Sequence, residues 1–335
     1  MANLNPTCIP VKYSSTNKSS SKKEDSSEEK TFEDKRYIIG TSGYMYPIWT
    51  KKVVPPAMRA QATTFYSTVS SAAILKEYCT HFKAVEINCT RYKQLTPTQC
   101  ANWYKNTPDD FIFSIKMPLY ITHQKKLNDF EEWWSKDFYP CIKKLKHKLG
   151  VLLFQFKDMK CTPKNINKLM NVKSIIPVGM RCAFEFRTMD WYEAEKVLRK
   201  TVFTGNWVLV TNFVTNGGIT QSDFGELKDG IIEAISQHFT VPFTYIRLHG
   251  SLGYCEGTYG SDTLITQVYS RCTANINFIF FNNTDTWEPF SIGQIYDADI
   301  PLNSLWPLSH YMLKIGTTTI LSAVMDALLL SRLVT

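Results

Sequence analysis

The chain has 335 residues, 44% of them apolar and 13% aromatic, which is enough to build one large α/β domain or two ordinary ones. Its formal charge of +8 favours anionic partners such as nucleic acid, phosphorylated metabolites or acidic lipid, but is too low for a dedicated nucleic-acid-binding protein. Nine cysteines without CxxC spacing argue against a disulfide framework or a zinc site, and they predict reduced thiols and an intracellular, cytoplasm-like location.

Residues 1–36 are predicted to form a flexible tail. Ser14–Lys30 consists almost entirely of Ser, Lys, Glu and Asp, so it cannot bury enough apolar surface to offset the entropy of ordering. The start of the tail has no apolar core, so we expect no secretion signal. The folded domain is expected to span 37–335. Within it, Ile320–Leu330 is apolar but short and interrupted by Asp326, so we expect no membrane span.

From Tyr37 onward, short apolar runs typical of strands alternate with longer amphipathic runs typical of helices. Strands are predicted over 37–41, 83–89, 111–118, 149–156, 180–187, 207–213, 244–250 and 276–283. Helices are predicted over 68–82, 97–106, 128–148, 164–176, 190–200, 223–239, 261–273 and 318–333. Strands that are each followed by a helical pattern predict a (β/α)8 TIM-type barrel, with an open doubly wound α/β sheet as the alternative.

Polar residues of the predicted strands are expected to line the barrel interior at its carboxyl end. Thr244–Gly250 is the clearest case, because its apolar residues alternate with Tyr245, Arg247 and His249. The same alternation places further polar residues on inward faces, namely Glu86, Asn88, Ser114, Lys116, Gln155, Glu185, Arg187, Asn212 and Asn282. Barrel enzymes carry their chemistry at this end of the strands. Buried charges there must pair with one another or line a wet pocket.

Several motifs follow one another along the chain: Thr41-Ser42-Gly43, Val85-Glu86-Ile87-Asn88, Ile121-Thr122-His123, Lys148-Leu149-Gly150, Phe184-Glu185-Phe186-Arg187, Tyr245-Ile246-Arg247-Leu248-His249-Gly250 and Phe281-Asn282-Asn283. Together they resemble the YecE-like family, catalogued as domain of unknown function 72. The resemblance covers about 37–283 and resumes in the last helix. It implies a TIM-type barrel, and it implies no established biochemical activity.

The chain departs from the family's pattern at polar positions of the expected mouth. Thr188 stands where a histidine is usual, Asn212 where an aspartate is usual, and Thr284 where another aspartate is usual. The resemblance therefore carries no activity over to this chain. Residues 284–317 are an insertion before the last helix. Because they leave the carboxyl end of the eighth strand, we expect them to cover part of the mouth, with packing against outer helices or a partner chain as the alternative.

Glu86, Glu185 and His249, from the second, fifth and seventh strands, are the catalytic candidates. Their carboxylate and imidazole groups can transfer protons, with Glu185 expected to stay ionised and His249 to titrate near neutrality. They can also ligate a divalent metal, but barrel metal sites usually contain more His and Asp, so we assign no metal ligand and leave the cofactor open. The alternative is a salt-bridge network with the inward lysine and arginines.

Three inward cations, Lys116, Arg187 and Arg247, outnumber the two inward glutamates and predict a cationic pocket. Arginine binds phosphate or carboxylate through paired hydrogen bonds, so Arg187 and Arg247 are expected to hold an anionic ligand from two sides. The other ligand-binding candidates are polar or aromatic residues close to the strand ends: Tyr44, Asn88, His123, Gln155, Asn282 and Asn283.

Aromatic residues and lysines also follow the predicted strands. The aromatic residues are Tyr44, Tyr46, Trp49, Tyr92, Trp191, Tyr254 and Tyr259, and the lysines include Lys125, Lys126 and Lys157. This combination suits single-stranded nucleic acid, whose bases stack on aromatic rings and whose phosphates form ion pairs with lysines. The alternative is a sugar- or metabolite-binding mouth with solvated lysines. The run Lys143–Lys148 is expected to be a solvated helix face. No Gly-x-Ser-x-Gly or Walker-type loop supports serine catalysis or nucleotide hydrolysis.

Two functions from different classes are predicted. The first is an enzyme that acts on an anionic substrate, phosphorylated or nucleic acid, at the carboxyl mouth by acid–base or hydrolytic chemistry. The second is a non-catalytic binding or structural protein built on a degenerate barrel. Salt-dependent retention on single-stranded nucleic acid would favour the nucleic-acid version of either function.

Overall fold

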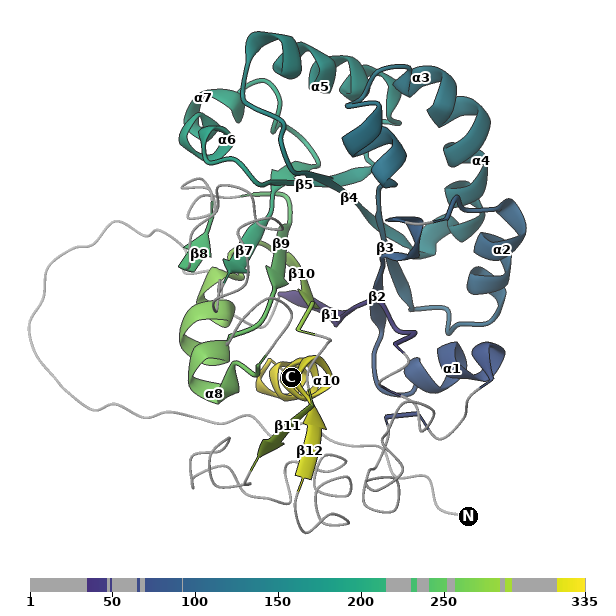
Figure 1. Ribbon diagram of the computed structural model, residues 1–335, viewed down its shortest axis with the longest axis vertical. Helices are drawn as coiled ribbons and strands as arrows, with labels where there is room; N and C mark the ends of the chain where they lie inside the picture. Colours follow the sequence, from purple (N-terminus) through teal and green to yellow (C-terminus); the bar gives the residue numbers. More distant parts are fainter. Residues whose placement is uncertain are drawn as a thin grey trace, which may run out of the picture. The chain divides into compact units, whose positions relative to one another are not determined.

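The computed structural model describes most of the chain from Lys35 to Val334 (Figure 1). The described residues are 35–46, 49, 65–66, 70–91, 93–214, 230–233, 241–251, 257–283, 287–290 and 318–334. The predicted tail, 1–36, lies outside these ranges except for Lys35 and Arg36. Lys35 Nζ donates to the carbonyl oxygen of Cys272 at 2.8 Å, and Arg36 opens the first strand, one residue before its predicted start.

Within the described ranges, ten strands form one curled and mostly parallel sheet. Their bounds are β1 Arg36–Ser42, β2 Ala84–Ile87, β3 Ile112–Lys116, β4 Leu149–Phe156, β5 Arg181–Phe186, β6 Trp207–Leu209, β7 Thr211–Val214, β8 Gly230–Ile232, β9 Thr244–Leu248 and β10 Ile276–Phe281. Their order is β6-β5-β4-β3-β2-β1-β10-β9-β7-β8, and neighbouring strands are parallel except β7 and β8.

The sheet curls so far that β6, at one end of the strand order, and β7, near the other end, are consecutive in the chain. β6 pairs with β5, β7 pairs with β9, and only Val210 lies between β6 and β7. Elsewhere in the ring β1 pairs with both β2 and β10, so strands from the two ends of the domain are neighbours. Figure 1 shows this ring of strands with helices outside it. The predicted TIM-type α/β barrel is confirmed.

Strand alternation divides the apolar residues into two clusters. Outward residues such as Val85, Phe184 and Ile246 belong to the large core between the sheet and the helices. Inward residues form a smaller cluster inside the barrel. Six of them precede an inward polar residue by two positions, in the pairs Ala84 and Glu86, Leu153 and Gln155, Ala183 and Glu185, Val210 and Asn212, Tyr245 and Arg247, and Phe280 and Asn282. A packed apolar layer therefore supports the polar residues of the carboxyl end.

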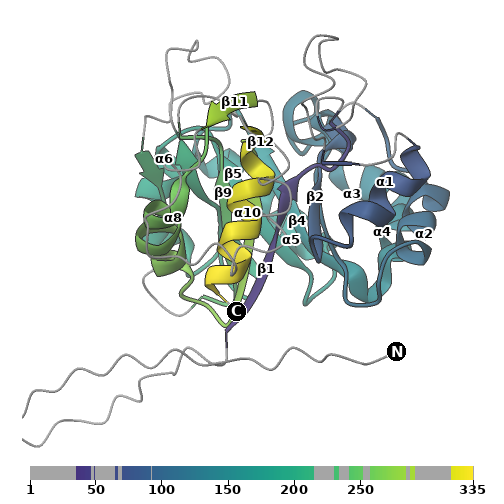
Figure 2. The ribbon, with the colours of Figure 1, turned by 90° about the horizontal axis from the view of Figure 1, so that it is seen from below.

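Helices cover the outside of the sheet (Figure 2). Their bounds are η4 Cys89–Arg91, η5 Tyr120–Gln124, η6 Trp134–Phe138, η7 Lys143–Lys148, η9 Leu264–Val268, η10 Tyr269–Arg271, α1 Ser71–Tyr78, α2 Pro97–Lys105, α3 Phe130–Trp133, α4 Tyr139–Ile142, α5 Pro163–Ile175, α6 Asp190–Glu193, α7 Glu195–Leu198, α8 Gly260–Thr263 and α10 Ser322–Leu333. Thr96 and Thr162 cap α2 and α5, accepting backbone N–H groups at 3.1 and 3.3 Å, and a proline follows each.

Two predicted helices are partly wrong. Within 223–239, the described residues include β8, which pairs antiparallel with β7; the other described residue of that range is Glu233. In 318–333, the first four residues form strand β12, Thr318–Leu321, before α10 begins. Their two threonines and an isoleucine are β-branched and favour a strand. β12 pairs antiparallel with β11, Trp287–Phe290. The other residues of the 284–317 insertion lie outside the described residues, and so does the prediction that the insertion covers the mouth.

Lys148 corrects the prediction that Lys143–Lys148 is a solvated face. Its side chain is buried, and Nζ donates to the carbonyl oxygens of Tyr104 at 2.7 Å and Thr107 at 2.8 Å. These carbonyls belong to the carboxyl-terminal end of α2 and the residues after it, where a cation satisfies unpaired carbonyl groups and the helix dipole. Lys148 thus joins α2 to the start of β4.

Candidate functional site

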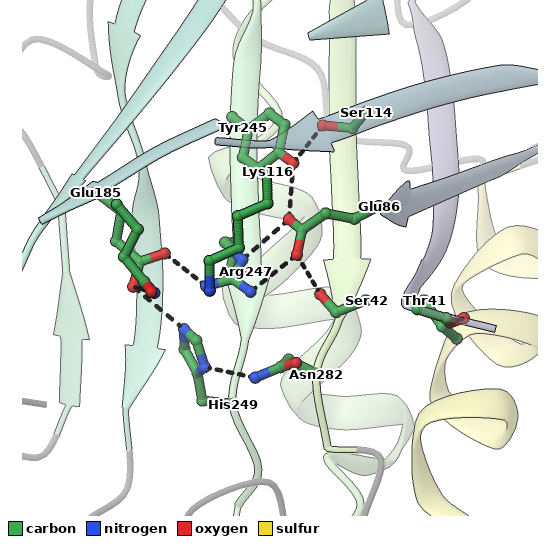
Figure 3. A network of polar contacts seen from close by, with 12 residues as sticks. Thr41, Ser42, Glu86, Ser114, Lys116, Glu185, Tyr245, Arg247, His249 and Asn282 are labelled. Carbon is green, nitrogen blue, oxygen red and sulfur yellow. Dashed lines mark hydrogen bonds and ion pairs between the residues drawn. The ribbon is translucent and has the colours of Figure 1, made fainter. Parts of the chain in front are cut away.

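The charged residues predicted to face inward lie together at the carboxyl end of the barrel (Figure 3). The register of β1 with β2 sets Ser42 beside Glu86, and the register of β4 with β5 sets Gln155 beside Glu185. Six ionisable side chains meet here, each at most 7% exposed: Glu86, Lys116, Glu185, Arg187, Arg247 and His249. We call this set the inner network.

Arg247 joins the two glutamates of the inner network. Its Nε and Nη2 donate to Oε2 and Oε1 of Glu86 at 3.0 and 2.8 Å, which makes a bidentate ion pair. Its Nη1 donates to Oε2 of Glu185 at 2.6 Å. Because Arg247 is 1% exposed and both carboxylates are fully buried, solvent ions screen these contacts little. For Arg247, the geometry matches the salt-bridge network considered from the sequence.

The Glu86 carboxylate is held by two further donors. Ser42 Oγ donates to Oε1 at 2.7 Å, and the Tyr245 hydroxyl donates to Oε2 at 2.7 Å. The Tyr245 hydroxyl also lies 2.7 Å from Ser114 Oγ. Burial, followed by the charge of Glu86, raises the pKa of Tyr245 well above its ordinary value, so this hydroxyl keeps its proton and remains a donor.

The Glu185 carboxylate collects donors from three strands or their ends. Arg247 reaches Oε2, while Gln155 Nε2 donates to Oε1 at 2.9 Å and Arg187 Nη2 forms an ion pair with the same oxygen. Burial alone would raise the pKa of the Glu185 carboxyl, but the guanidinium groups of Arg187 and Arg247 hold it below its usual range. Glu185 is therefore ionised near neutral pH, as the sequence predicts.

His249 is neutral near pH 7, and the expectation that it titrates there is wrong. Burial, and then the positive charges of Arg247 and Arg187, lower the pKa of the imidazole well below its ordinary value. Asn282 Nδ2 lies 3.1 Å from Nδ1 and Asn212 Oδ1 lies 3.2 Å from Nε2. An amide donor at Nδ1 and a carbonyl acceptor at Nε2 suit the tautomer that carries its proton on Nε2.

Lys116 differs from the arginines of the inner network. It extends from the end of β3 into the space occupied by Arg247 and Glu185 (Figure 3). Within the described part of the chain its amine makes no hydrogen bond and no ion pair. Burial, together with the charge of Arg247 and against the attraction of Glu185, lowers the pKa of Lys116 to about 7. Lys116 therefore exchanges its proton near neutrality.

Two other ligand-binding candidates, Gln155 and Asn282, bond to residues of the inner network, and a third, Asn88, lies two residues after Glu86. Gln155 and Asn282 are partly exposed and bond to Glu185 and His249, so solvent reaches this end of the barrel. Asn88 is also partly exposed, and its Oδ1 is a buried acceptor without a hydrogen-bond partner among the described residues. Such an acceptor is available to a bound ligand.

Asn283 is used elsewhere. Its Nδ2 donates to the carbonyl oxygen of Gly257 at 2.7 Å and to Oδ2 of Asp326 at 2.9 Å. Asp326, on α10, also accepts the backbone N–H of Tyr259 at 3.0 Å. Burial raises the pKa of Asp326 to about 7, although the hydrogen bonds from Tyr259 and Asn283 oppose this rise. These contacts join α10 to the residues before α8 and after β10.

His123 and Tyr44, the remaining ligand-binding candidates, also make their described contacts away from the inner network. His123 lies in η5, and its Nδ1 is 2.8 Å from Thr122 Oγ1. Tyr44 is 9% exposed and packs against Tyr78, with 5.9 Å between ring centroids. The structure therefore does not bring these two residues to the charged centre.

Several aromatic residues predicted to ring the mouth belong to the core. Trp49 and Trp191 are fully buried. Trp191 stacks on Phe186 with 4.1 Å between ring centroids and donates from Nε1 to the Met159 carbonyl oxygen. They offer no exposed face on which a base could stack. Two others, Tyr92 and Tyr254, lie outside the described residues.

Three residues of this site were not among the sequence candidates. Ser42, Ser114 and Tyr245 complete the hydrogen bonding of Glu86, directly or through the tyrosine hydroxyl. Strand alternation places Tyr245 and Ser114 on inward faces, each two positions from a charged residue of its strand, but it does not show that they complete the hydrogen bonding of Glu86. Nothing in the sequence indicates that Ser42 is the partner of Glu86, since that pairing depends on the register of β1 with β2.

The described residues contain no group of three His, Cys, Asp or Glu side chains placed to hold a metal ion. Where the structure describes cysteines, they are free thiols: Cys79, Cys89, Cys100, Cys141, Cys161, Cys182 and Cys272. No helix among the residues described above has both the length and the apolar character needed to cross a membrane.

Comparison with known proteins identifies relatives by sequence. The family model described as protein of unknown function DUF72 matches residues 38–289. The UPF0759 protein YecE of Escherichia coli (strain K12) is 40% identical over 58 residues, which cover 17% of this chain and 21% of that protein. The UPF0759 protein YunF of Bacillus subtilis (strain 168) is 28% identical over 126 residues, covering 35% of this chain and 44% of that protein. The chain thus aligns with less than half the length of these curated relatives.

A solved structure supports the fold. A DUF72 family protein from Thermotoga maritima superposes on this chain with a TM-score of 0.56 and 20% sequence identity. The superposition covers 89% of this chain and 98% of that protein. At this identity the likeness concerns the arrangement of strands and helices, and it assigns no role to any side chain.

Proposed function

The chain belongs to the DUF72 family of proteins of unknown function, so its function has to be argued from the site, and we propose that the carboxyl end of the barrel binds a small anionic ligand. The ligand is of the phosphate or carboxylate class. Lys116 and Arg187 are its cationic contacts, and Asn88, Gln155 and Asn282 are the polar groups around it.

The observation that carries this proposal is the charge balance of the inner network. Glu86 and Glu185 are matched by the guanidinium groups of Arg247 and Arg187. Lys116 is left as a buried cation with no ion-pair partner within the described part of the chain. An uncompensated buried charge is costly, so an anion that enters beside Lys116 gains an ion pair that the protein itself does not supply.

Burial favours a small anion over a nucleic-acid strand. Lys116 and Arg187 are 7% and 3% exposed, so they can contact a compact group that enters the mouth. Binding of single-stranded nucleic acid requires an exposed basic groove with aromatic faces for its bases. Trp49 and Trp191, which the sequence offered as such faces, are buried.

The same geometry divides the roles of the predicted catalytic residues. Glu86 and Glu185 are saturated with donors, which suits fixed anions that position the arginines rather than proton donors. His249 is neutral and lies between the amides of Asn212 and Asn282, which fix its tautomer and orientation beside the network. In this proposal Lys116 takes over the acid–base role, because its pKa of about 7 lets it give and take a proton near neutrality.

Thermal unfolding across a phosphate titration at constant ionic strength tests the proposal. Phosphate should raise the melting temperature of the wild type and of Lys83→Gln, a control at an exposed surface lysine. In Lys116→Gln the apparent affinity should fall about ten- to hundredfold, because one charged hydrogen bond is worth roughly 1.5–3 kcal/mol. Equal shifts in all three proteins would contradict an anion site at Lys116.

A structural role for the inner network is the second candidate function. The observation that favours it is Arg247, whose contacts with both glutamates are already closed. Under this alternative the network only holds strands together, as in a non-catalytic binding or structural protein. Phosphate would then leave the melting temperature of the wild type unchanged.

A further inference from the structure

We propose that Lys116 is a covalent site, whose amine condenses with a small carbonyl compound that also carries an anionic group. The class comprises 2-oxo acids and phosphorylated aldehydes or ketones, which share a carbonyl carbon close to a carboxylate or phosphate. This inference rests on the proposed function and deepens it, because it names the substrate class of the same site and the bond that the substrate forms.

The backbone around Lys116 is fixed, so its side chain is aimed into the barrel. Ile115 and Met117, its neighbours in sequence, are buried in the outer core. The Lys116 carbonyl oxygen accepts a hydrogen bond from Thr90 Oγ1, and the next backbone N–H donates to the carbonyl oxygen of Leu153 at 2.8 Å. A lysine on a rigid strand holds its amine more accurately than a lysine on a loop.

A nucleophilic lysine must be deprotonated, and the surroundings of Lys116 favour the neutral amine. The charged and titratable groups facing it come from three strands or their ends: Glu86 of β2, Glu185 and Arg187 of β5, and Arg247 and His249 of β9. The two carboxylates already neutralise the two guanidinium groups, so burial decides the balance. The resulting pKa of about 7 leaves a substantial neutral fraction at physiological pH.

Lys148 shows what a buried lysine looks like when its role is structural. It is 3% exposed, less than Lys116, yet its Nζ donates to two carbonyl oxygens and to Thr107 Oγ1. Those donated bonds need the ammonium protons and occupy the nitrogen. Lys116 has no such bonds within the described residues, so its nitrogen lone pair is available to an electrophile.

The reaction balances without any further reagent. The neutral Nζ attacks the carbonyl carbon and forms a C–N bond, while one of its protons moves to the carbonyl oxygen and gives a carbinolamine. Loss of the nitrogen proton and of the hydroxyl group as one water molecule leaves the C=N bond of an imine. The anionic group of the substrate is placed beside the Arg187 guanidinium group, which holds the carbonyl near Lys116.

Reductive trapping on the intact wild-type chain tests this inference. The protein is incubated near pH 7 with sodium cyanoborohydride and glyoxylate, glycolaldehyde phosphate or uncharged glycolaldehyde, and the labelled lysines are mapped by peptide mass spectrometry. We expect at least one anionic compound to label Lys116 about tenfold more than glycolaldehyde does, which corresponds to one charged contact. Labelling by glyoxylate alone identifies a 2-oxo acid, and labelling by the phosphate identifies a phosphorylated carbonyl compound. Lys148 should stay unlabelled.

Lys116→Arg is the matched variant, because it keeps the positive charge but cannot form a stable imine at this pH. It should lose the label at this position. A wild type that phosphate stabilises, with no adduct at Lys116 from any compound, would overturn the imine and leave the anion site standing. A wild type with neither stabilisation nor adduct overturns both proposals. Equal labelling by glycolaldehyde and by both anionic compounds overturns the anionic substrate class. If the variant does not fold, the comparison of Lys116 with Lys148 in the wild type still decides.

Discussion

Arg247 is the residue on which the order of the inner network depends. It donates to glutamates from two different strands while it is itself almost completely buried. Such an arrangement does not by itself show a large net stabilisation, because desolvation offsets much of the attraction. Removing one partner has a much larger effect, since the remaining charges stay buried without compensation.

Arg247→Ala should therefore lower the free energy of unfolding by about 3–5 kcal/mol, because it leaves Glu86 and Glu185 buried without their shared cation. Urea unfolding at neutral pH measures the difference. Arg271→Ala is the matched control: Arg271 pairs with Glu233 at 2.8 Å, but the two side chains are 22% and 18% exposed. We expect the control to lose about 1 kcal/mol. An equal loss in both variants would contradict a structural role for Arg247.

At the residue scale, strand alternation predicted the side chains that face inward but not the bonds between them. Glu185 and Arg247 were placed correctly on inner faces. The pairing of Arg247 with Glu86 depends on the curvature that brings β9 across from β2, and no local pattern encodes that curvature. His249 shows the consequence, because its pKa follows from neighbours on other strands rather than from its own sequence context.

At the element scale, Asp326 connects the last helix to two other segments through hydrogen bonds. The carboxylate on α10 accepts hydrogen bonds from the segment before α8 and from Asn283 after β10. Three segments that are far apart in sequence therefore meet at one side chain. Because this side chain is buried and its pKa is about 7, the strength of the junction changes with pH.

The sign of this pH dependence follows from proton binding. An unfolded aspartate titrates at about 3.9, so between about pH 4 and pH 7 the folded state binds more protons than the unfolded state. The stability that Asp326 contributes is present below about pH 4 and is lost as the pH rises through about 7. Asp326→Asn should make the decline of unfolding free energy with pH shallower, by at most about 1.4 kcal/mol per pH unit.

Urea unfolding of the wild type and Asp326→Asn at several pH values in this window measures the slope. Asp110→Asn is the control, because the hydrogen bond from Lys83 lowers the pKa of Asp110 and moves its titration below the window. Parallel curves for the wild type and Asp326→Asn would show that Asp326 is not protonated in the folded protein near neutrality.

Elements were predicted well where periodicity repeats and poorly where it is short. The main strands of the barrel were found within a few residues of their bounds because each lies in a short, mostly apolar run. β8 and β12 are three and four residues long, which is too short for a repeating pattern of apolar residues to be recognised. Lys148 was misjudged for a different reason: its acceptors lie about 40 residues earlier, at the end of α2.

At the scale of the whole molecule, the barrel separates two kinds of interior. A layer of apolar side chains fills one part, and the inner network occupies the carboxyl end. The apolar layer supplies burial free energy, whereas the charged layer has to be assembled with its partners in place. This separation lets the site change its chemistry without disturbing the packing that maintains the fold.

The barrel should not need the predicted tail. Deleting residues 1–34 should leave the melting temperature within a few degrees of the wild type, because β1 begins at Arg36 and Lys35 is retained. Deleting residues 1–38 is the matched control, since it removes three residues that pair with Ile276–Phe278 and should destabilise the fold clearly. Loss of folding in the shorter deletion would show that the tail contributes to the domain.

The pairing of β1 with β10 has a consequence for synthesis on the ribosome. Arg36 pairs with Ile276, so 276 − 36 = 240 residues must be translated after one partner before the other exists. At about 5–20 residues per second this takes roughly 12–48 s. Throughout that interval the nascent chain presents the open hydrogen-bonding edge of β1 to solvent. We expect molecular chaperones to occupy that edge until translation reaches β10.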